Sequence, residues 1–347
     1  AQGDKNLVVN GAMTVDQRNQ TTTATGYTVD RFALAKSNFD ELVIAVTQDT
    51  DNPSGNGFAH SLKLAVTTAE SAIAADELLY LDTRFEGQNI QHLCYGTSSA
   101  KSLTLSFWVK SPLAGKHSVN FYQSTPVRSN LQSYTVSSAN TWEYKTITID
   151  GDTSGNIAND TTAEIILFWP LAGGTNYHGT PHTGWGAYTD TDDFMFSDQV
   201  NLAGQTGNFF LTGVQLEIGE VATPFEHEDV GTTLAKCQRY FYSVAKGSNL
   251  TICNANSYST TAVYGTIHFP VTMRSNPTSV GAATGTNYFR FYSAASATDF
   301  DSWTGLNDQT ANGCTIYKAS LSSLTAGRGG WFVTNNASAW LYFSAEL

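Results

Sequence analysis

The stretch TGVQLEIGEVATPFEHEDVGTTLAKCQRYFYS, residues 212–243, contains the end of one predicted domain and a junction that leads into the next. Val214, Leu216 and Ile218 alternate with glycine or polar residues, which is the period-two pattern of a half-buried strand. Pro224 then ends strand pairing, because its nitrogen has no proton to donate. The sequence therefore predicts a domain whose last strand precedes Pro224.

A helix is predicted from Thr232 to Val244. Leu234, Cys237 and Phe241 recur at near-helical spacing, with acidic residues before them and basic residues after them, as the helix dipole favours. The helix has two interpretations: a linker packed on its own chain, or an apolar stripe along the axis of a three-chain fibre.

The rest of the chain predicts an all-β protein. Alternating apolar segments are separated by turns rich in Gly, Pro, Asn and Asp, as in 49–57, 111–117 and 150–156. Strands at this spacing favour a jelly-roll β-sandwich, followed after the helix by a second, smaller β-sandwich. The predicted domains are 1–228 for the jelly roll, 229–246 for the helical linker and 247–347 for the C-terminal sandwich. The predicted strands include 62–66, 79–85, 103–109, 147–149, 165–169, 214–218 and 263–269.

Composition excludes several classes of function. The formal net charge is -12 and no basic stripe is visible, which argues against a protein that follows the phosphates of nucleic acid. No run of apolar residues is long enough to cross a bilayer, so we expect no membrane insertion. The chain begins at Ala1, as expected for a piece of a longer chain, a processed chain, or removal of Met before Ala.

The amino-acid sequences of two segments resemble those of a known protein family. GVQLEIGEVATPFE followed by CQRYFY, and the opening NLVVNGAMTVDQRN with GYTVDRFAL, are similar to tail-associated virion proteins of bacteriophages. LTLSFWVKSP and TWEYKTITI resemble strands of carbohydrate-binding jelly rolls with a galactose-binding-like fold. The resemblance implies a non-enzymatic fibre or adhesin protein on the virion tail, outside the host cell, that binds host surface glycans and contacts other tail proteins, as a homotrimer. Asp30, Arg31 and Glu217 recur in that family, and we interpret them as ion-pair or hydrogen-bond anchors.

The loop GGTNYHGTPHTGWGAYTDTDDFMF, residues 173–196, is the candidate ligand site. Aromatic rings stack on the C–H face of a sugar while imidazoles bind its hydroxyls. The alternative is that Trp185 plugs the edge of the sandwich core and the acids are solvated. The predicted ligand-binding residues are Tyr177, His178, His182, Trp185 and Tyr188.

Asp190, Asp192 and Asp193 in the same loop are candidate calcium ligands, because hard cations prefer several oxygens close together. Asp150 and Asp152 resemble the start of an EF-hand loop, but Thr161 stands where a bidentate Glu is required, so that interpretation fails. Carbohydrate-binding jelly rolls often hold one structural calcium ion. The resemblance therefore implies such a site without locating it.

No catalytic motif is visible, so we predict a protein that is not an enzyme. A glycosidase needs two carboxylates across a cleft, and the sequence singles out no such pair. Nucleophile and phosphate-binding motifs are absent too. The four cysteines are far apart and predict free, mostly buried thiols rather than a zinc site. Two alternatives to a receptor-binding protein remain open: a glycan-binding module of a polysaccharide-degrading enzyme, and a purely structural virion protein.

Overall fold

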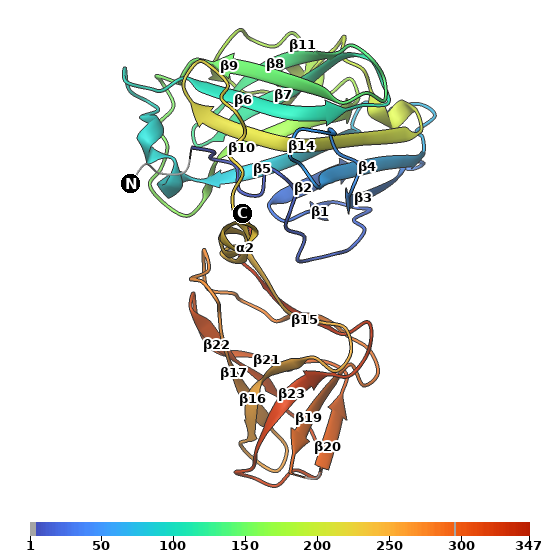
Figure 1. The fold of residues 1–347 in the computed structure, drawn as a ribbon, viewed down its shortest axis with the longest axis vertical. Coiled ribbons are helices and arrows are strands. Elements are labelled where there is room, and N and C mark those ends of the chain that lie inside the picture. Colours follow the sequence, from blue (N-terminus) through green and yellow to red (C-terminus); the bar gives the residue numbers. More distant parts are fainter. Residues whose placement is uncertain (1–4, 295) are drawn as a thin grey trace. The chain divides into compact units, whose positions relative to one another are not determined.

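The computed structural model describes residues 5–294 and 296–347, and Ala1 lies outside them. The chain divides into two compact units. The first comprises residues 1–233 and Leu347, and the second comprises residues 234–346. Figure 1 colours the first unit from blue to yellow and the second from yellow to red. The sequence-based expectation that residues 1 to about 228 fold without the rest of the chain stays a prediction.

The first unit is a β-sandwich of a seven-stranded and a five-stranded antiparallel sheet, which confirms the predicted all-β fold. In spatial order the larger sheet contains β1 (Gly26–Tyr27), β2 (Phe32–Ser37), β5 (Leu78–Glu86), β10 (Ala163–Gly173), β7 (Gly115–Ser124), β8 (Val127–Val136) and β12 (Gly186–Ala187). The smaller sheet contains β3 (Val43–Asp49), β4 (Ser61–Thr68), β14 (Gly207–Ile218), β6 (Leu103–Lys110) and β9 (Glu143–Ile149).

Alternation along the strands builds the core between these sheets. On β10, Ile165, Leu167 and Trp169 are buried in the main core, whereas Phe168 belongs to a smaller cluster with Phe194. Every segment predicted as a strand in this unit lies in a strand of the sandwich, whereas the hairpin β7–β8 was not predicted. The shorter elements of the unit are η1 (Gly87–Asn89), η2 (Gln91–Leu93), β11 (His178–Gly179), α1 (Asp190–Asp193), β13 (Met195–Phe196) and η3 (Leu202–Gly204).

The second unit is also built from two antiparallel sheets. In spatial order the seven-stranded sheet contains β20 (Ser296–Phe300), β19 (Phe289–Ser293), β23 (Gly329–Thr334), β16 (Thr251–Ser257), β17 (Val263–His268), β22 (Gly313–Lys318) and β21 (Gly305–Thr310). The three-stranded sheet contains β15 (Phe241–Lys246), β24 (Trp340–Ser344) and β18 (Gly281–Ala283). Its core is rich in phenylalanine, including Phe289, Phe291 and Phe332.

The helical linker predicted for 229–246 is shorter than expected. Helix α2 runs from Val230 to Gln238, and the residues after it form β15, which pairs with β24. Aromatic and β-branched residues at 241–244 favour a strand, and pairing with β24 outweighs the near-helical spacing. Cys237 and Phe241 are both buried, and Phe241 packs against Trp340 and Tyr342 of the same unit. These two residues of the predicted apolar stripe are therefore covered by their own chain and are not exposed for contact with other chains.

All four cysteines are free thiols, as predicted, with Cys237 and Cys314 buried and Cys94 and Cys253 half-buried. Burial raises the pKa of the Cys314 thiol to about 11. Within the part of the chain that the structure describes, no helix has the length and apolar character needed to span a membrane.

Candidate functional site

The loop predicted as the ligand site lies against the hairpin β7–β8. Its short strand β12 pairs with β8, so that Gly186 lies opposite Ser129. His182 fixes the loop further: Nδ1 lies 2.6 Å from Asp193 Oδ1 and Nε2 lies 2.8 Å from the Ser129 carbonyl oxygen. Both partners are hydrogen-bond acceptors, so both ring nitrogens of His182 tie the loop to neighbouring groups. His182 therefore holds the loop in place.

Trp185 lines an open hollow of about 380 Å³ beside the first half of β8 and the end of β9. The indole is half-buried: it packs against the main core, lies edge-on to Tyr95 with ring centroids 5.7 Å apart, and donates from Nε1 to the Asp150 carbonyl oxygen at 2.8 Å. The ring therefore closes the sandwich edge, as one interpretation from the sequence expected, and it also lines the hollow. That Trp185 binds a ligand there stays a prediction.

The other lining residues come from the end of β9 and the loop after it, residues 148–154, from residues 183–184, and from β8, which the sequence did not single out. Asn130 and Gln132 share one face of that strand, and the Gln132 amide donates to Asn130 Oδ1 at 2.6 Å. Arg128 lies on the same face and forms a two-pronged ion pair with the buried Asp152, at 2.5 and 3.1 Å. Asp152 Oδ1 also accepts from the Ser154 backbone N–H at 3.0 Å. The hollow therefore combines one indole with amides and a neutralised ion pair.

The remaining predicted ligand residues lie away from this hollow. Tyr177 and Tyr188 pack on the smaller aromatic cluster, Tyr177 near Phe194 and Tyr188 edge-on to Tyr122 at 5.0 Å. Burial and the hydrogen bond to Asp190 raise the pKa of the Tyr188 hydroxyl far above its usual range. His178 belongs to β11, which pairs with β13. Of the five predicted residues, only Trp185 lines the hollow.

The three predicted metal ligands each have a separate structural contact. Asp190 accepts from the Tyr188 hydroxyl at 2.7 Å, and Asp192 lies 3.3 Å from the Thr180 backbone nitrogen. Asp193 is buried and accepts from His182 and, at 2.8 Å, from the Thr189 backbone N–H. Among the described residues, these three do not form a group whose carboxylate oxygens all converge.

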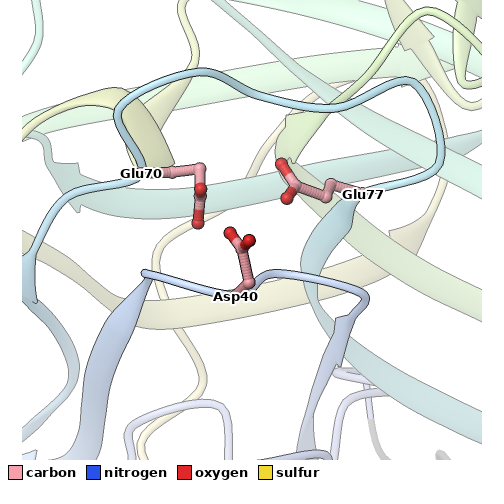
Figure 2. Close-up of side chains that lie close together, drawn as sticks. All are labelled: Asp40, Glu70 and Glu77. Atoms are coloured by element: carbon pink, nitrogen blue, oxygen red, sulfur yellow. The ribbon is translucent and has the colours of Figure 1, made fainter.

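A different set of carboxylates does converge. Asp40, between β2 and β3, faces Glu70 and Glu77, which flank the loop between β4 and β5, and one oxygen of each lies within 4.8 Å of the others. Figure 2 shows the three side chains pointing toward one another from two loops. Glu70 and Glu77 are buried. An all-oxygen set of this kind fits a hard cation such as calcium.

Some of these oxygens already have partners. Glu70 Oε2 accepts from the backbone N–H groups of Glu41 and Leu42, at 3.2 and 3.0 Å, and Glu77 Oε2 accepts from that of Ala74 at 2.8 Å. Burial raises the pKa of the Glu77 carboxyl, the Ala74 N–H opposes the rise, and the charge of Glu70 adds to it. The three carboxyls therefore lie close together, where like charges repel unless a cation or a proton offsets them.

We expect Glu77→Gln to stabilise the first unit at pH 7 in the presence of a chelator. A raised folded-state pKa means that the carboxyl favours folding below its unfolded pKa and loses that contribution as pH rises through the folded value. The amide mimics the protonated form and still accepts from Ala74. Scanning calorimetry should show a midpoint higher by about 2–4 °C, the shift that about 1 kcal/mol gives in a domain of this size.

The gain from Glu77→Gln should vanish near pH 4, where the native carboxyl is protonated. Added calcium should reverse the order, because the native side chain offers a charged ligand that the amide does not. Glu220→Gln, at an exposed position of the same unit outside the cluster, is the control and should change little. A less stable Glu77→Gln protein in chelator at pH 7 would contradict this account.

No protein-family model matches the sequence, and a comparison with curated proteins finds no relative. Among solved structures, the chain is similar to the enzymatically active domain of bacteriophage CBA120 tailspike protein 4, with 13% identity, a TM-score of 0.34, and coverage of 62% of this chain and 22% of that one. It is also similar to a family 11 carbohydrate-binding module from Clostridium thermocellum in complex with a β-1,3-1,4-mixed-linked tetrasaccharide, with 12% identity, a TM-score of 0.29, and coverage of 56% and 91%. A third similar structure is TmCBM61 in complex with β-1,4-galactotriose, with 10% identity, a TM-score of 0.29, and coverage of 62% and 100%.

Proposed function

We propose that this protein binds a neutral glycan in the hollow beside Trp185. The supporting observation is the convergence of an indole and two amide side chains, Asn130 and Gln132, at one open depression. An indole offers flat apolar area to the C–H face of a sugar ring, and amides donate to and accept from its hydroxyl groups. The hollow is open, so a sugar can enter without a change of fold.

Charge supports a neutral ligand over a charged one. Arg128 is already neutralised by Asp152 through two hydrogen bonds, so it does not present a free cation to an acidic sugar. The chain as a whole carries a formal net charge of -12, which repels polyanions at long range. An uncharged oligosaccharide meets neither obstacle.

We propose binding without cleavage. Glycoside hydrolysis uses two carboxyl groups across the scissile bond, one of them an acid with a raised pKa. Asp150 and Asp152 line the hollow, and Asp152 is committed to Arg128 and to the Ser154 N–H. This commitment supports a structural role for Asp152 rather than proton transfer.

We further propose that the binding serves host attachment at a bacteriophage tail, outside the host cell. The support is the resemblance of residues 6–19 and 212–243 to tail-associated virion proteins. A homotrimer and contacts with other tail proteins belong to the same proposal and rest on the resemblance alone, since Cys237 and Phe241 of the predicted stripe are buried within their own chain. A module of a polysaccharide-degrading enzyme and a structural virion protein are the alternatives.

A glycan array probed with the whole chain tests the proposal. We expect binding to one class of neutral oligosaccharide, and Gln132→Ala should weaken it about two- to tenfold, which is the loss of one neutral hydrogen bond. Gln132 is half-buried and donates to a neighbouring side chain, so the change should leave the fold intact.

Tyr144→Ala is the matched control, because Tyr144 is 44% exposed on β9 and does not line the hollow. It should bind as the native chain does. If no neutral glycan is bound, or if Gln132→Ala and Tyr144→Ala bind with the same affinity as the native chain, the hollow is not the binding site.

A further inference from the structure

The outer face of the seven-stranded sheet in the second unit carries a row of aromatic rings. Alternation along each strand separates this face from the core: Phe291 and Phe332 point into the core, and their neighbours Tyr292 and Trp331 lie on the opposite face. On β17 and β22, the buried residues Val263 and Ile316 likewise alternate with residues of the outer face.

Strand register aligns these outer residues across the sheet. Trp331 lies opposite Tyr292 on one side and Asn254 on the other, while Tyr264 lies opposite Tyr317 and Asn256. Asn254 and Asn256 are two residues apart on β16 and share its outer face. From β19 to β22 the row crosses four strand spacings, about 19 Å. We call these six residues, Tyr292, Trp331, Asn254, Asn256, Tyr264 and Tyr317, the aromatic platform.

The rings of the platform are arranged as neighbours. Tyr264 and Tyr317 are stacked, with centroids 5.1 Å apart and planes 8° apart, and Tyr292 lies 5.3 Å from Trp331. The ring of Tyr258, a residue that is 74% exposed and directly follows β16, has its centroid 5.3 Å from that of Tyr264. Trp331 is 41% exposed. Large apolar rings thus stay in contact with solvent on both sides of β16.

The middle of the platform is polar and open. Asn254 and Asn256 are exposed, and Gly329, opposite Asn256, faces open space. Beside the row, Arg290 binds Asp299 through two hydrogen bonds of 2.5 and 2.9 Å and donates to the Tyr292 hydroxyl at 3.0 Å. The six residues of the row themselves carry no charge.

We propose that the aromatic platform is a second binding surface, for an extended neutral polysaccharide. Rings separated by exposed amides match a chain of sugars, whose C–H faces stack on rings and whose hydroxyls bind amides. The uncharged row suits an uncharged polymer, and its length accommodates several consecutive sugar rings. A second copy of the chain fits less well, because the centre of a stable interface excludes water and Asn254 and Asn256 occupy this centre. The platform is separate from the hollow beside Trp185 and does not depend on it.

Affinity electrophoresis of the full chain in native gels tests this proposal. The gels contain mixed-linkage β-glucan, β-1,4-galactan, xylan or galactomannan, with anionic alginate as a comparison. All variants carry Trp185→Ala, so that retardation reports on sites other than the hollow. We expect one neutral polymer to retard this protein, and Trp331→Ala to weaken the retardation about tenfold, as for an exposed aromatic anchor. Asn256→Ala should weaken it less, and Tyr144→Ala should leave it unchanged.

Three results would overturn the proposal. The first is that none of the neutral polymers retards the Trp185→Ala protein. The second is that Trp331→Ala and Asn256→Ala, both checked for folding by circular dichroism, migrate as their parent does. The third is that no polymer retards the protein, while sedimentation shows the parent to be an oligomer and Trp331→Ala to be a monomer. That result would make this face a contact between copies of the chain. Because the hollow is disabled throughout, failure here leaves the proposed function of the hollow standing.

Discussion

Glu217→Ala should destabilise the first unit by about 3 kcal/mol, because it removes a buried charged acceptor from three donors. Glu217 Oε1 accepts from the Thr223 backbone N–H and the Gln215 amide, both at 2.9 Å, and Oε2 accepts from the Thr223 hydroxyl at 2.7 Å. The carboxyl is 2% exposed, so water cannot replace the lost acceptor. Calorimetry on the full chain should show the transition of the first unit at a markedly lower temperature.

The same carboxyl should make the fold sensitive to acid. Desolvation opposes ionisation, but the hydrogen bonds from Thr223 and Gln215 together outweigh it and lower the pKa of Glu217 below its usual value. A lowered folded-state pKa contributes stability above the unfolded value, and that stability is lost as pH falls through the folded value. Glu217→Gln should reduce this acid dependence.

Glu220→Ala is the control for Glu217→Ala, because Glu220 is an exposed carboxylate on the same chain segment. It should change stability by less than about 0.5 kcal/mol. Equal stability of the two variants would show that the hydrogen bonds of Glu217 contribute nothing to the fold.

The contacts of Glu217 belong to a larger polar network that links the two ends of the first unit. Asn6 Oδ1 accepts from the Leu216 N–H at 3.0 Å, and the Asn6 N–H donates to Glu226 at 2.7 Å. Glu226 in turn donates its backbone N–H to Gln215 at 2.8 Å. The two segments whose sequences resemble phage tail proteins are thus joined to each other by hydrogen bonds within the first unit. The prediction that Glu217 is a hydrogen-bond anchor is confirmed.

Apolar alternation predicted those strands whose inward residues are uniformly apolar. On β6, Leu103, Leu105, Phe107 and Val109 are all fully buried, and this regularity is visible in the sequence. The hairpin β7–β8 lacks it, because Asn120, together with other polar residues of the two strands, is buried between apolar neighbours. Buried polar residues of this kind hide a strand from a pattern that counts only apolar positions.

Only part of the candidate site was predictable, because most of its residues come together through strand pairing rather than through a local sequence pattern. Trp185 could be identified because an aromatic residue in an irregular loop is a local feature of the sequence. Arg128, Asn130 and Gln132 reach the same hollow through the pairing of β12 with β8 and the fold of the loop after β9. The register of β12 against β8 pairs residues that are far apart in the sequence, so a local sequence pattern does not reveal it. The turn at Thr125 and Pro126, between two segments of strand-forming residues, was the available sign of the hairpin.

Trp185→Ala should weaken glycan binding about ten- to a hundredfold, which corresponds to about 1.4–2.8 kcal/mol for the loss of an aromatic anchor. It should also lower stability by about 2 kcal/mol, less than for a fully buried tryptophan, because the indole is only half-buried against the core and Tyr95. The ring therefore contributes to the fold through its packing and through its hydrogen bond to Asp150.

Trp185→Phe separates the two roles of the ring. Phenylalanine keeps a flat apolar face toward the hollow but cannot donate to the Asp150 carbonyl, so stability should fall while most of the glycan affinity remains. Binding and thermal unfolding measured on both variants at a temperature where all proteins are folded give the comparison. If Trp185→Ala loses stability and folded molecules still bind at the native affinity, the indole only closes the edge of the sandwich, and the sugar site must lie elsewhere on the chain.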